Sequence, residues 1–467
     1  MKHISFILPF MSNAVLHKPN PLTEPVVHVG IVGGHTISFS LNGPYTLNGT
    51  PMTGDLEATV AHGLIHLNGE AYTCLLFSPA GEESSFSLHD VTIGVNFHWE
   101  RKETQTFRGA LKLIADKGKL WAVNIIQVEQ YLESVISSEM SATSNLPLLM
   151  AHAVISRSWL LAQIHGDPAK AANVSVSASQ IAPSRVAEAA TKRIIKWYDH
   201  TNHTLFDVCA DDHCQRYQGI TKATSPHVKE AIDRTHGQIL VFNGEICDTR
   251  FSKCCGGALE EYQYCWDDRP KPYLRALGDT PSEKIPDLTN EDNARKWILS
   301  SPESFCNTQD KRILGQVLNG YDQETTDFYR WHVVYTQQEL SALIRKKLDM
   351  DLGDILQIIP LKRGKSGRIY ELEIIGTRQS VIVGKELEIR RILSESHLLS
   401  SAFVVTTVSG PLRDGKTIPS GFRLDGAGWG HGVGLCQIGA AVMGDKGYAY
   451  DDILRHYYPN TKIETAW

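Results

Sequence analysis

A glutamate lies among apolar residues in the segment YLESVISSEM, which spans residues 131–140. At about 100° per residue, a helix over this segment would place Glu139 near the middle of an arc of apolar side chains. Poor solvation disfavours the charged form of a carboxyl group and raises its pKa. A carboxylic acid of that kind can donate a proton near neutral pH. The alternative, which the helical pattern alone favours, is a buried carboxylate paired with Arg157 or His152.

Two imidazoles and two thiols follow one another closely in the sequence, at His203, Cys209, His213 and Cys214. This donor set matches tetrahedral zinc chemistry. Adjacent His and Cys ligands are not a finger-type spacing, so a strand or tight loop would have to present both to one ion. A Cys209–Cys214 disulfide or free thiols would explain the same residues, and Cys254 and Cys255 could compete as partners.

Glycines alternate at positions 428, 430, 432 and 434 in a Gly-rich run that an Ala-rich helix is expected to follow. The spacing fits neither a dinucleotide fingerprint nor a phosphate-binding loop. Alternating glycines let a backbone approach a bulky ligand closely, Trp429 offers a flat face for a sugar, and His431 offers a polar edge. A structural turn around a packed Trp429 explains the run equally well.

The elements that must position these residues follow from the hydrophobic pattern. The segment 146–164 is apolar on almost every side, so we expect a buried helix with a cap at Ser144 or Asn145. Its His152 and Arg157 are then either satisfied polar groups of the core or groups that orient the glutamate. Strand-length runs precede this helical pair, and FRGALKLIADKGKLWAVNI predicts a hairpin with a Lys-Gly turn.

The predicted fold class is α+β, mixed and strand-rich, with a buried helical pair that carries the glutamate. QQELSALIRKKL predicts a helix, and ILQIIPL, IYELEIIG and QSVIVG predict strands. The predicted organisation is an N-terminal segment (1–25), a β-rich domain (26–123), the first part of a core (124–280), an inserted α/β subdomain (281–400) and the C-terminal part of the core with the Gly-rich run (401–467).

Composition excludes several classes of protein. The 467 residues are 42% hydrophobic and 21% charged, which is typical of a globular chain. The net charge of −6, without a basic stripe, gives no nucleic-acid footprint. No segment approaches the roughly 18 apolar residues of a membrane span, and the N-terminus is a poor secretion signal. Six of the nine cysteines fall between Cys209 and Cys265, which predicts a local metal or redox feature.

Four sequence blocks stand in a fixed order: YLESVISSEM with MAHAVISRSW, DVCADDHCQRYQG, FSKCCGGALEEYQYCW with PYL, and GWGHGVGLCQIGAAVMGDKGYAYDDILRHYYPNTKI. Together they resemble the stage II sporulation protein D family, the SpoIID/LytB amidase-enhancer group. The resemblance covers residues from about 100 to 465, and the strand-rich start looks like the family's usual lead-in. Four ordered motifs are highly specific, whereas one alone would be weak.

The resemblance implies a peptidoglycan lytic transglycosylase, a lyase that cuts the β-1,4 bond between MurNAc and GlcNAc and closes a 1,6-anhydro ring without water. The family's acid and base is the glutamate of its Glu-Met pair, which is Glu139 here. The implied partner is peptidoglycan glycan, with strands stripped of stem peptides preferred. The implied location is the cell envelope, the periplasm or the cell exterior.

The resemblance also implies a structural zinc ion. The residues that match the family's ligands are His203, Cys209, His213 and Cys214. One residue less than in the family separates Cys209 from the His-Cys pair. The candidate glycan contacts, five matching family positions and the tryptophan of the Gly-rich run, are Gln215, Tyr217, Gly256, Trp429, His431 and Gln437.

Departures from the family pattern are His152 and Trp159 in AHAVISRSW, Cys436 in place of the usual Ser, and the insertion at 281–400. Two other functions are considered. One is a non-catalytic enhancer that binds wall glycan and stimulates an amidase. The other is a zinc hydrolase, which would need an open coordination position that four protein ligands do not leave.

Overall fold

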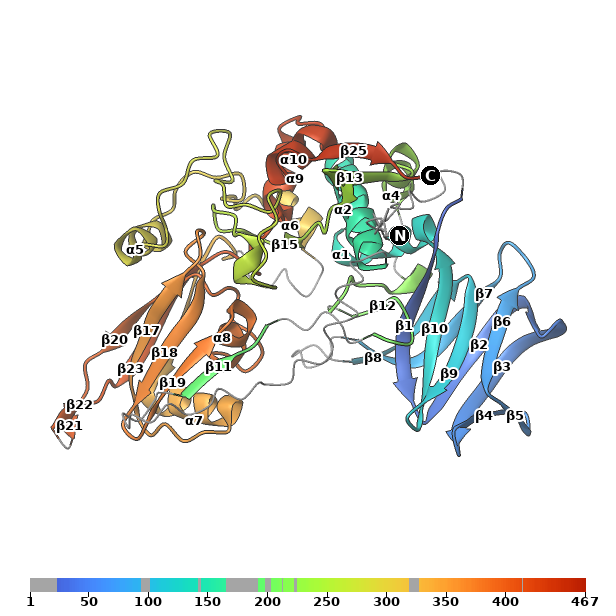
Figure 1. Ribbon diagram of the computed structural model, residues 1–467, viewed down its shortest axis with the longest axis horizontal. Coiled ribbons are helices and arrows are strands. Elements are labelled where there is room, and N and C mark those ends of the chain that lie inside the picture. The colour runs from blue at the N-terminus through green and yellow to red at the C-terminus, as the bar shows by residue number, and fades with distance from the viewer. Residues whose placement is uncertain are drawn as a thin grey trace, which may run out of the picture.

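Two strand-rich lobes flank a central group of helices in the computed structural model (Figure 1). The predicted α+β, strand-rich class is confirmed. The predicted N-terminal segment lies almost wholly outside the described residues. These are 23–93, 101–141, 144–164, 192–197, 203–211, 213–221, 225–318, 327–413 and 415–467.

The first lobe is a large sheet in which strands alternate between buried and exposed positions. In β2, for example, Ile37, Phe39 and Leu41 are buried and alternate with polar residues, as a sheet with one solvated face requires. The predicted hairpin is confirmed as β9 and β10, and its turn places Lys117 and Gly118 at positive φ, as a two-residue hairpin turn demands. The strands are β1 (Val26–Gly34), β2 (Thr36–Leu47), β3 (Thr50–Ala61), β4 (Leu64–Leu67), β5 (Glu70–Tyr72), β6 (Cys74–Pro79), β7 (Ser85–Ile93), β8 (Arg101–Arg108), β9 (Ala110–Asp116) and β10 (Lys119–Gln127).

The predicted helical pair follows directly. Helix α1 (Val128–Glu139) continues from β10, and α2 (Leu146–Ile164) occupies the predicted range. The Asn145 side chain caps α2 by accepting a hydrogen bond from the Leu148 N–H at 3.0 Å. Every residue of α2 from Leu148 to Leu161 is buried, because α1, α4 (Pro226–Arg234), α9 (Gln437–Asp445) and α10 (Tyr450–Tyr457) surround it.

Short elements connect this helical group to its surroundings. Strand β12 (Val208–Cys209) adds in parallel to β1 and so ties the cysteine-containing segment to the first lobe. Strand β15 (Phe251–Ser252) pairs in parallel with β24 (Leu435–Cys436), which joins the central segment to the Gly-rich run. The other short elements are β13 (Gln238–Phe242), β14 (Glu245–Ile246), β25 (Lys462–Thr465) and the 3₁₀ turns η1 (Gly219–Thr221) and η2 (Tyr262–Tyr264).

The second lobe has a core of its own, in which Leu372, Val383 and Ile389 are fully buried. The predicted helix at 337–348 is α7, with a capping box between Thr336 and Glu339. The elements of this lobe and its border are β11 (Lys192–Ile195), α5 (Glu291–Leu299), α6 (Lys311–Val317), β16 (Arg330–Thr336), α7 (Gln337–Leu348), β17 (Ile355–Arg363), β18 (Ile369–Gly376), β19 (Ser380–Gly384), α8 (Glu386–Ile392), β20 (Phe403–Val408), β21 (Leu412–Arg413), β22 (Lys416–Thr417) and β23 (Gly421–Ala427).

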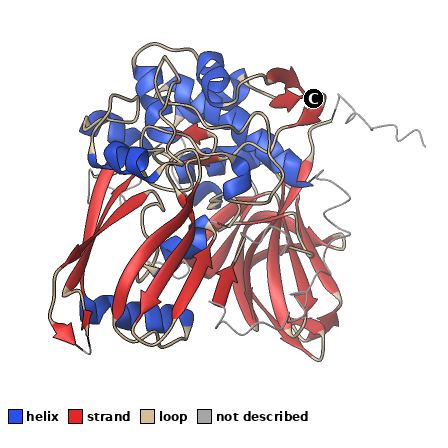
Figure 2. Cartoon of the chain, turned by 60° about the vertical axis from the view of Figure 1, so that its left-hand side comes forward, coloured by secondary structure: helices blue, strands red, loops and turns tan. Residues whose placement is uncertain are grey.

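The second lobe differs in extent from the predicted insertion at 281–400. Strands β20 and β23 lie beyond residue 400 yet pair with each other and, through β23, with β16. Strand β11 lies far before residue 281 and pairs with β19. Helix α6 instead packs into the main core through Ile313 and Leu314. Figure 2 shows the two groups of strands with most helices gathered at one end of both.

Among the residues described, no helix has both the length and the apolar character needed to cross a bilayer.

Candidate functional site

Glu139 is the last residue of α1, where its side chain is partly exposed. Its Oε1 accepts a hydrogen bond from the backbone N–H of Arg216 at 3.0 Å. The Lys253 ammonium donates to the backbone oxygen of Glu139 at 3.0 Å and to that of Val317 at 3.2 Å. A cation at a helix C-terminus is favourable, because the last carbonyls carry partial negative charge. Two segments distant in sequence therefore hold the end of the helix.

The alternative partners considered for Glu139 are engaged elsewhere. Arg157 is fully buried and pairs with Glu129, donating from Nε to Oε1 at 2.9 Å. His152 lies between Ser156, at 3.1 Å from Nδ1, and Gln437, at 3.2 Å from Nε2. Burial lowers the pKa of His152 to about 3, with the charge of Lys253 as a second cause. The interpretation of Arg157 and His152 as satisfied core groups is confirmed, and a pairing of either with Glu139 is wrong.

The segment that follows the cysteines is hydrogen-bonded along α1. Three hydrogen bonds join it to the helix. The Tyr131 hydroxyl donates to Gln215 Oε1 (3.3 Å), and the Gln218 N–H donates to Ser134 Oγ (3.0 Å). The third is the bond from the Arg216 N–H to Glu139. The Tyr217 hydroxyl donates to Asn124 Oδ1 at 2.5 Å, and its ring stacks on Tyr131 at 5.0 Å. Residues 214–218 therefore form a strap across the helix that carries Glu139.

The four predicted metal ligands lie together at the start of this strap. One potential ligand atom from each of His203, Cys209, His213 and Cys214 lies within 4.8 Å of the others. The Cys214 sulfur is 3.5 Å from His203 Nε2 and 3.4 Å from His213 Nδ1. Zn–S and Zn–N bonds of about 2.3 and 2.0 Å in a tetrahedron place S and N about 3.5 Å apart. The donor set therefore fits one tetrahedral zinc ion.

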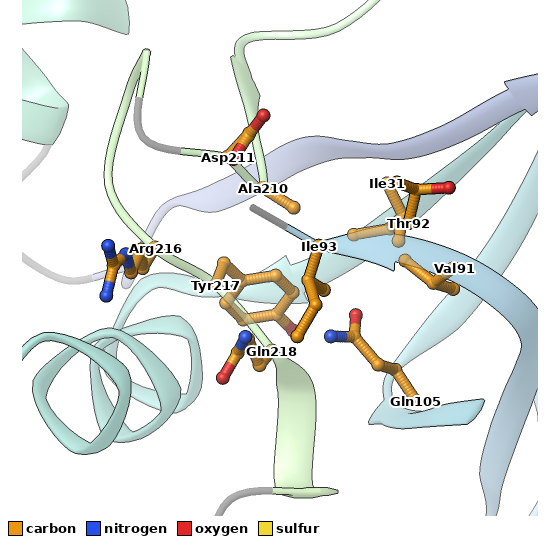
Figure 3. Close-up of a pocket in the computed structure, with 10 residues that line it drawn as sticks. All are labelled: Ile31, Val91, Thr92, Ile93, Gln105, Ala210, Asp211, Arg216, Tyr217 and Gln218. Carbon is orange, nitrogen blue, oxygen red and sulfur yellow. The ribbon is translucent and has the colours of Figure 1, made fainter. Parts of the chain in front are cut away.

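A small cavity lies on the far side of the strap, against the first lobe (Figure 3). Its volume is about 90 Å³, and Arg216, Tyr217 and Gln218 line it, whereas Glu139 does not. The buried Gln105 Nε2, also at this cavity, has no hydrogen-bond partner among the described residues. Ligand pockets measure about 300 Å³ or more and a water takes up about 30 Å³, so the cavity suits a few waters rather than a saccharide.

The glycines of the Gly-rich run face other protein segments. A Cβ on Gly428 would lie 2.7 Å from the Cys254 oxygen, and one on Gly434 would lie 1.9 Å from the Arg250 oxygen. Both glycines have positive φ, as do the two between them. The structure therefore supports the structural turn at these positions, because the close approach expected for a ligand is made by the protein's own backbone.

The two aromatic residues of this run are held by neighbours. Trp429 is partly exposed and one face stacks on Phe328, with ring centroids 5.0 Å apart and planes at 5°. His431 Nδ1 accepts from the Val433 N–H at 3.0 Å, and its ring packs edge-on against Trp266. Burial shifts the pKa of His431 well below its usual value, and the nearby charges of Arg250 and Arg368 act in the same direction. The polar edge expected to meet a sugar is thus used in part within the loop.

The other predicted glycan contacts are buried. Gln215, Tyr217 and Gln437 each expose 1% of their surface, and their polar groups bond within the core. Gly256 is buried at φ +76°, with Gly428 packed against it. These placements favour a positioning role over direct contact with a glycan.

Two groups at Glu139 were not predicted from the sequence. Arg216 acts through its backbone N–H, which any residue would supply, so its side chain gives no signal. Lys253 does carry a signal, because it is the one cation in FSKCCGG, next to two cysteines that are buried. A cation in so apolar a segment must find an oxygen partner.

Comparison with known proteins gives two family matches. Residues 116–242 match the model described as stage II sporulation protein, and residues 260–434 match a domain of unknown function. The stage II sporulation protein D of Bacillus subtilis (strain 168) is 25% identical over 349 residues, which are 74% of this chain and 76% of that protein. The protein of the same name from Bacillus amyloliquefaciens is 23% identical, with the same coverage.

The amidase enhancer of Bacillus subtilis is 22% identical over 260 residues, which are 51% of this chain and 32% of that protein. The chain thus spans about a third of that relative. The resemblance to the stage II sporulation protein D and amidase-enhancer group, predicted from the four ordered blocks, is confirmed by these matches.

Proposed function

We propose that this chain acts on the bacterial cell wall as a peptidoglycan lytic transglycosylase, with Glu139 as its acid and base. The family matches support a cell-wall role. The observation that supports the transglycosylase activity proposed here is the placement of Glu139. Its carboxyl group is partly exposed at a helix end, and a backbone N–H from the strap fixes one of its oxygens.

The reaction needs one carboxyl group in two successive roles. As an acid, Glu139 gives its proton to the O4 oxygen of GlcNAc as the bond from that oxygen to C1 of MurNAc breaks. As a carboxylate, it then accepts the proton of the MurNAc C6 hydroxyl, whose oxygen bonds to C1 and closes the anhydro ring. The carboxyl group ends protonated, as it began, and no water or redox partner is consumed.

The strap supplies positioning for this chemistry. Zinc held by His203, Cys209, His213 and Cys214 would fix the start of the strap, and four protein ligands leave no open position for substrate. The zinc would therefore be structural, and chelation that stopped turnover without loosening the strap would instead support a zinc hydrolase.

The proposed substrate is peptidoglycan glycan from which stem peptides have been removed. Trp429, with one face covered by Phe328 and its surface partly exposed, is the candidate for contact with a sugar ring. Four other candidate contacts are buried and would act from behind the surface, namely Gln215, Tyr217, Gly256 and Gln437. His431 is partly exposed. Such a substrate places the protein in the cell envelope or outside the cell.

The experiment compares two glutamates of α1. Glu139→Gln keeps the shape of the side chain and removes the transferable proton. Glu133→Gln alters a partly buried carboxyl group on the same helix and serves as the matched control. Digests of peptide-stripped peptidoglycan are analysed by mass spectrometry for 1,6-anhydro ends. We expect Glu139→Gln to release them about 10²–10⁴-fold more slowly, and Glu133→Gln to match the wild type. Equal release by Glu139→Gln would refute the assignment.

A non-catalytic enhancer of a cell-wall amidase is the second candidate, favoured by the relative named amidase enhancer and by the burial of Gln215 and Gln437. In that case the wild type and Glu139→Gln would bind wall glycan equally. Both would stimulate an added amidase to the same extent, and neither would release muropeptides alone.

A further inference from the structure

A second group of sulfur atoms lies in the core, apart from the zinc-type cluster that precedes the strap. Cys255, Cys306, Cys436 and Asp279 are all buried, and one ligand atom from each lies within 4.8 Å of the others. Cys254, which precedes Cys255 in the chain, is also fully buried. The residues come from four parts of the chain that are well separated in sequence.

The sulfur spacing fits one metal ion better than a disulfide. The sulfurs of Cys255 and Cys306 are 3.5 Å apart, far beyond the roughly 2.05 Å of an S–S bond. Two thiolates on one tetrahedral zinc ion, with Zn–S bonds of about 2.3 Å, stand about 3.8 Å apart. A multi-iron cluster would require its cysteines to surround several metal atoms, which is a wider arrangement than this one.

Asp279 is oriented by donors in the way that metal-binding carboxylates usually are. Its Oδ2 accepts from the Cys306 N–H at 2.8 Å and from the Ser304 hydroxyl at 3.1 Å. Its Oδ1 accepts from the Tyr457 hydroxyl at 2.7 Å, and His456 Nε2 lies 3.8 Å away. Such outer partners fix a ligand and tune its basicity.

We propose that Cys255, Cys306, Cys436 and Asp279 bind a second zinc ion, which is structural. Three thiolates and a carboxylate buried without a cation would be unfavourable, whereas a zinc ion would offset half of their four negative charges and bind each ligand directly. Soft sulfur ligands in a tetrahedral set select zinc over magnesium or calcium.

The ion would join three parts of the chain beside Glu139. Cys436 directly precedes α9 at the end of the Gly-rich run, Cys255 lies two residues after Lys253, and Cys306 precedes α6. Lys253 hydrogen-bonds to the Glu139 backbone, and its own backbone oxygen accepts from the Ile438 N–H at 3.1 Å. The second ion would therefore hold the segment that supports the end of α1.

Metal content of the full chain tests the proposal without any need for activity. The protein is loaded with zinc, freed of loosely bound metal and measured by mass spectrometry of the element. We expect two zinc ions per chain in the wild type, one in Cys306→Ser and one in Cys214→Ser. Cys265→Ser changes a buried cysteine outside both groups and should retain two.

X-ray absorption on Cys214→Ser gives the ligand set of the remaining ion. We expect three sulfurs and one oxygen, and Asp279→Asn in that background should weaken zinc binding by at least roughly tenfold. If Cys306→Ser does not fold, the wild type still tests the proposal, because a competing chelator should extract two zinc ions per chain from it. Zinc retained in full by a folded Cys306→Ser, a folded Cys214→Ser that holds no zinc, or a Cys255–Cys306 disulfide in the unreduced protein would overturn the proposal. None of these outcomes depends on the transglycosylase assignment.

Discussion

Two glutamates on α1 should differ strongly in how much their replacement by Gln destabilises the fold. Glu129, near the start of the helix, is 8% exposed and accepts from Arg157 Nε at 2.9 Å and from the Gly237 N–H at 3.0 Å. Glu139, at the end, is partly exposed and accepts from a backbone N–H. We expect Glu129→Gln to destabilise the fold and Glu139→Gln to leave it nearly intact.

The magnitudes follow from the partner that each change leaves behind. Glu129→Gln strands the guanidinium of Arg157, which is fully buried, and breaking a buried pair costs about 3–5 kcal/mol. Gln retains one acceptor oxygen, so we expect the lower end, about 3 kcal/mol. Glu139→Gln keeps an acceptor oxygen for the Arg216 N–H at a partly exposed position, so it should cost about 1 kcal/mol or less.

Urea unfolding followed by far-ultraviolet circular dichroism measures the difference. With a slope of about 3 kcal/mol per molar urea, Glu129→Gln should lower the midpoint by about 1 M and Glu139→Gln by about 0.3 M or less. The double variant Glu129→Gln/Arg157→Met removes both charges and should recover part of the loss, because the two residues are coupled.

A fall of less than 0.3 M for Glu129→Gln, or an equal fall for the two single changes, would refute the reasoning. Either result would mean that Arg157 is satisfied without Glu129. The argument that Glu129 serves the fold whereas Glu139 serves the function would then no longer be supported by a difference in stability.

Three further predictions concern the glycines, a buried acid and the strap. Gly434→Ala should lower the free energy of unfolding by at least about 2 kcal/mol, because the residue has a positive φ and its new Cβ would meet a carbonyl oxygen. Gly447→Ala, also at positive φ but with open space around the new Cβ, should lower it by about 1 kcal/mol. Urea unfolding midpoints compare the two variants. Burial raises the pKa of Glu260 to about 7, so the folded state holds this proton more tightly than the unfolded state does. The contribution of Glu260 to the free energy of unfolding is therefore fully present below pH 4.5. It is lost, by up to about 3 kcal/mol, as pH rises from 4.5 through 7. Unfolding midpoints should show this slope in the wild type and a flatter one in Glu260→Gln; parallel slopes would count against it. Removing zinc should speed amide exchange in residues 213–218 while α2 stays protected, and unchanged exchange would contradict zinc at the strap.

Local patterns in the sequence were sufficient for much of the fold. The Lys-Gly hairpin, the range of α2 and the capping residue Asn145 are set by neighbours within a few positions. The clustering of His203, Cys209, His213 and Cys214 was likewise visible, because all four lie in one short segment.

Contacts between distant segments were beyond the reach of such patterns. The pairing of β11 with β19, the partner of Arg157 and the convergence of Cys255 with Cys306 and Cys436 depend on which surfaces meet in space. Alternating glycines show that something approaches closely, but the sequence does not distinguish a ligand from the protein's own backbone. For the same reason the candidate glycan contacts were expected at a surface and lie mostly in the core.

Strand β11 has a consequence for any attempt to divide the molecule. It pairs with β19 from Lys192–Val381 to Ile195–Gly384, although α2 before it and the zinc-type cluster after it belong to the other half. A deletion of the chain between α6 and α9 would leave β11 as an unpaired edge, which invites aggregation. Transplanting the second lobe between homologues therefore requires two separate grafts, and evolution cannot have added or removed it in its present form as one uninterrupted cassette.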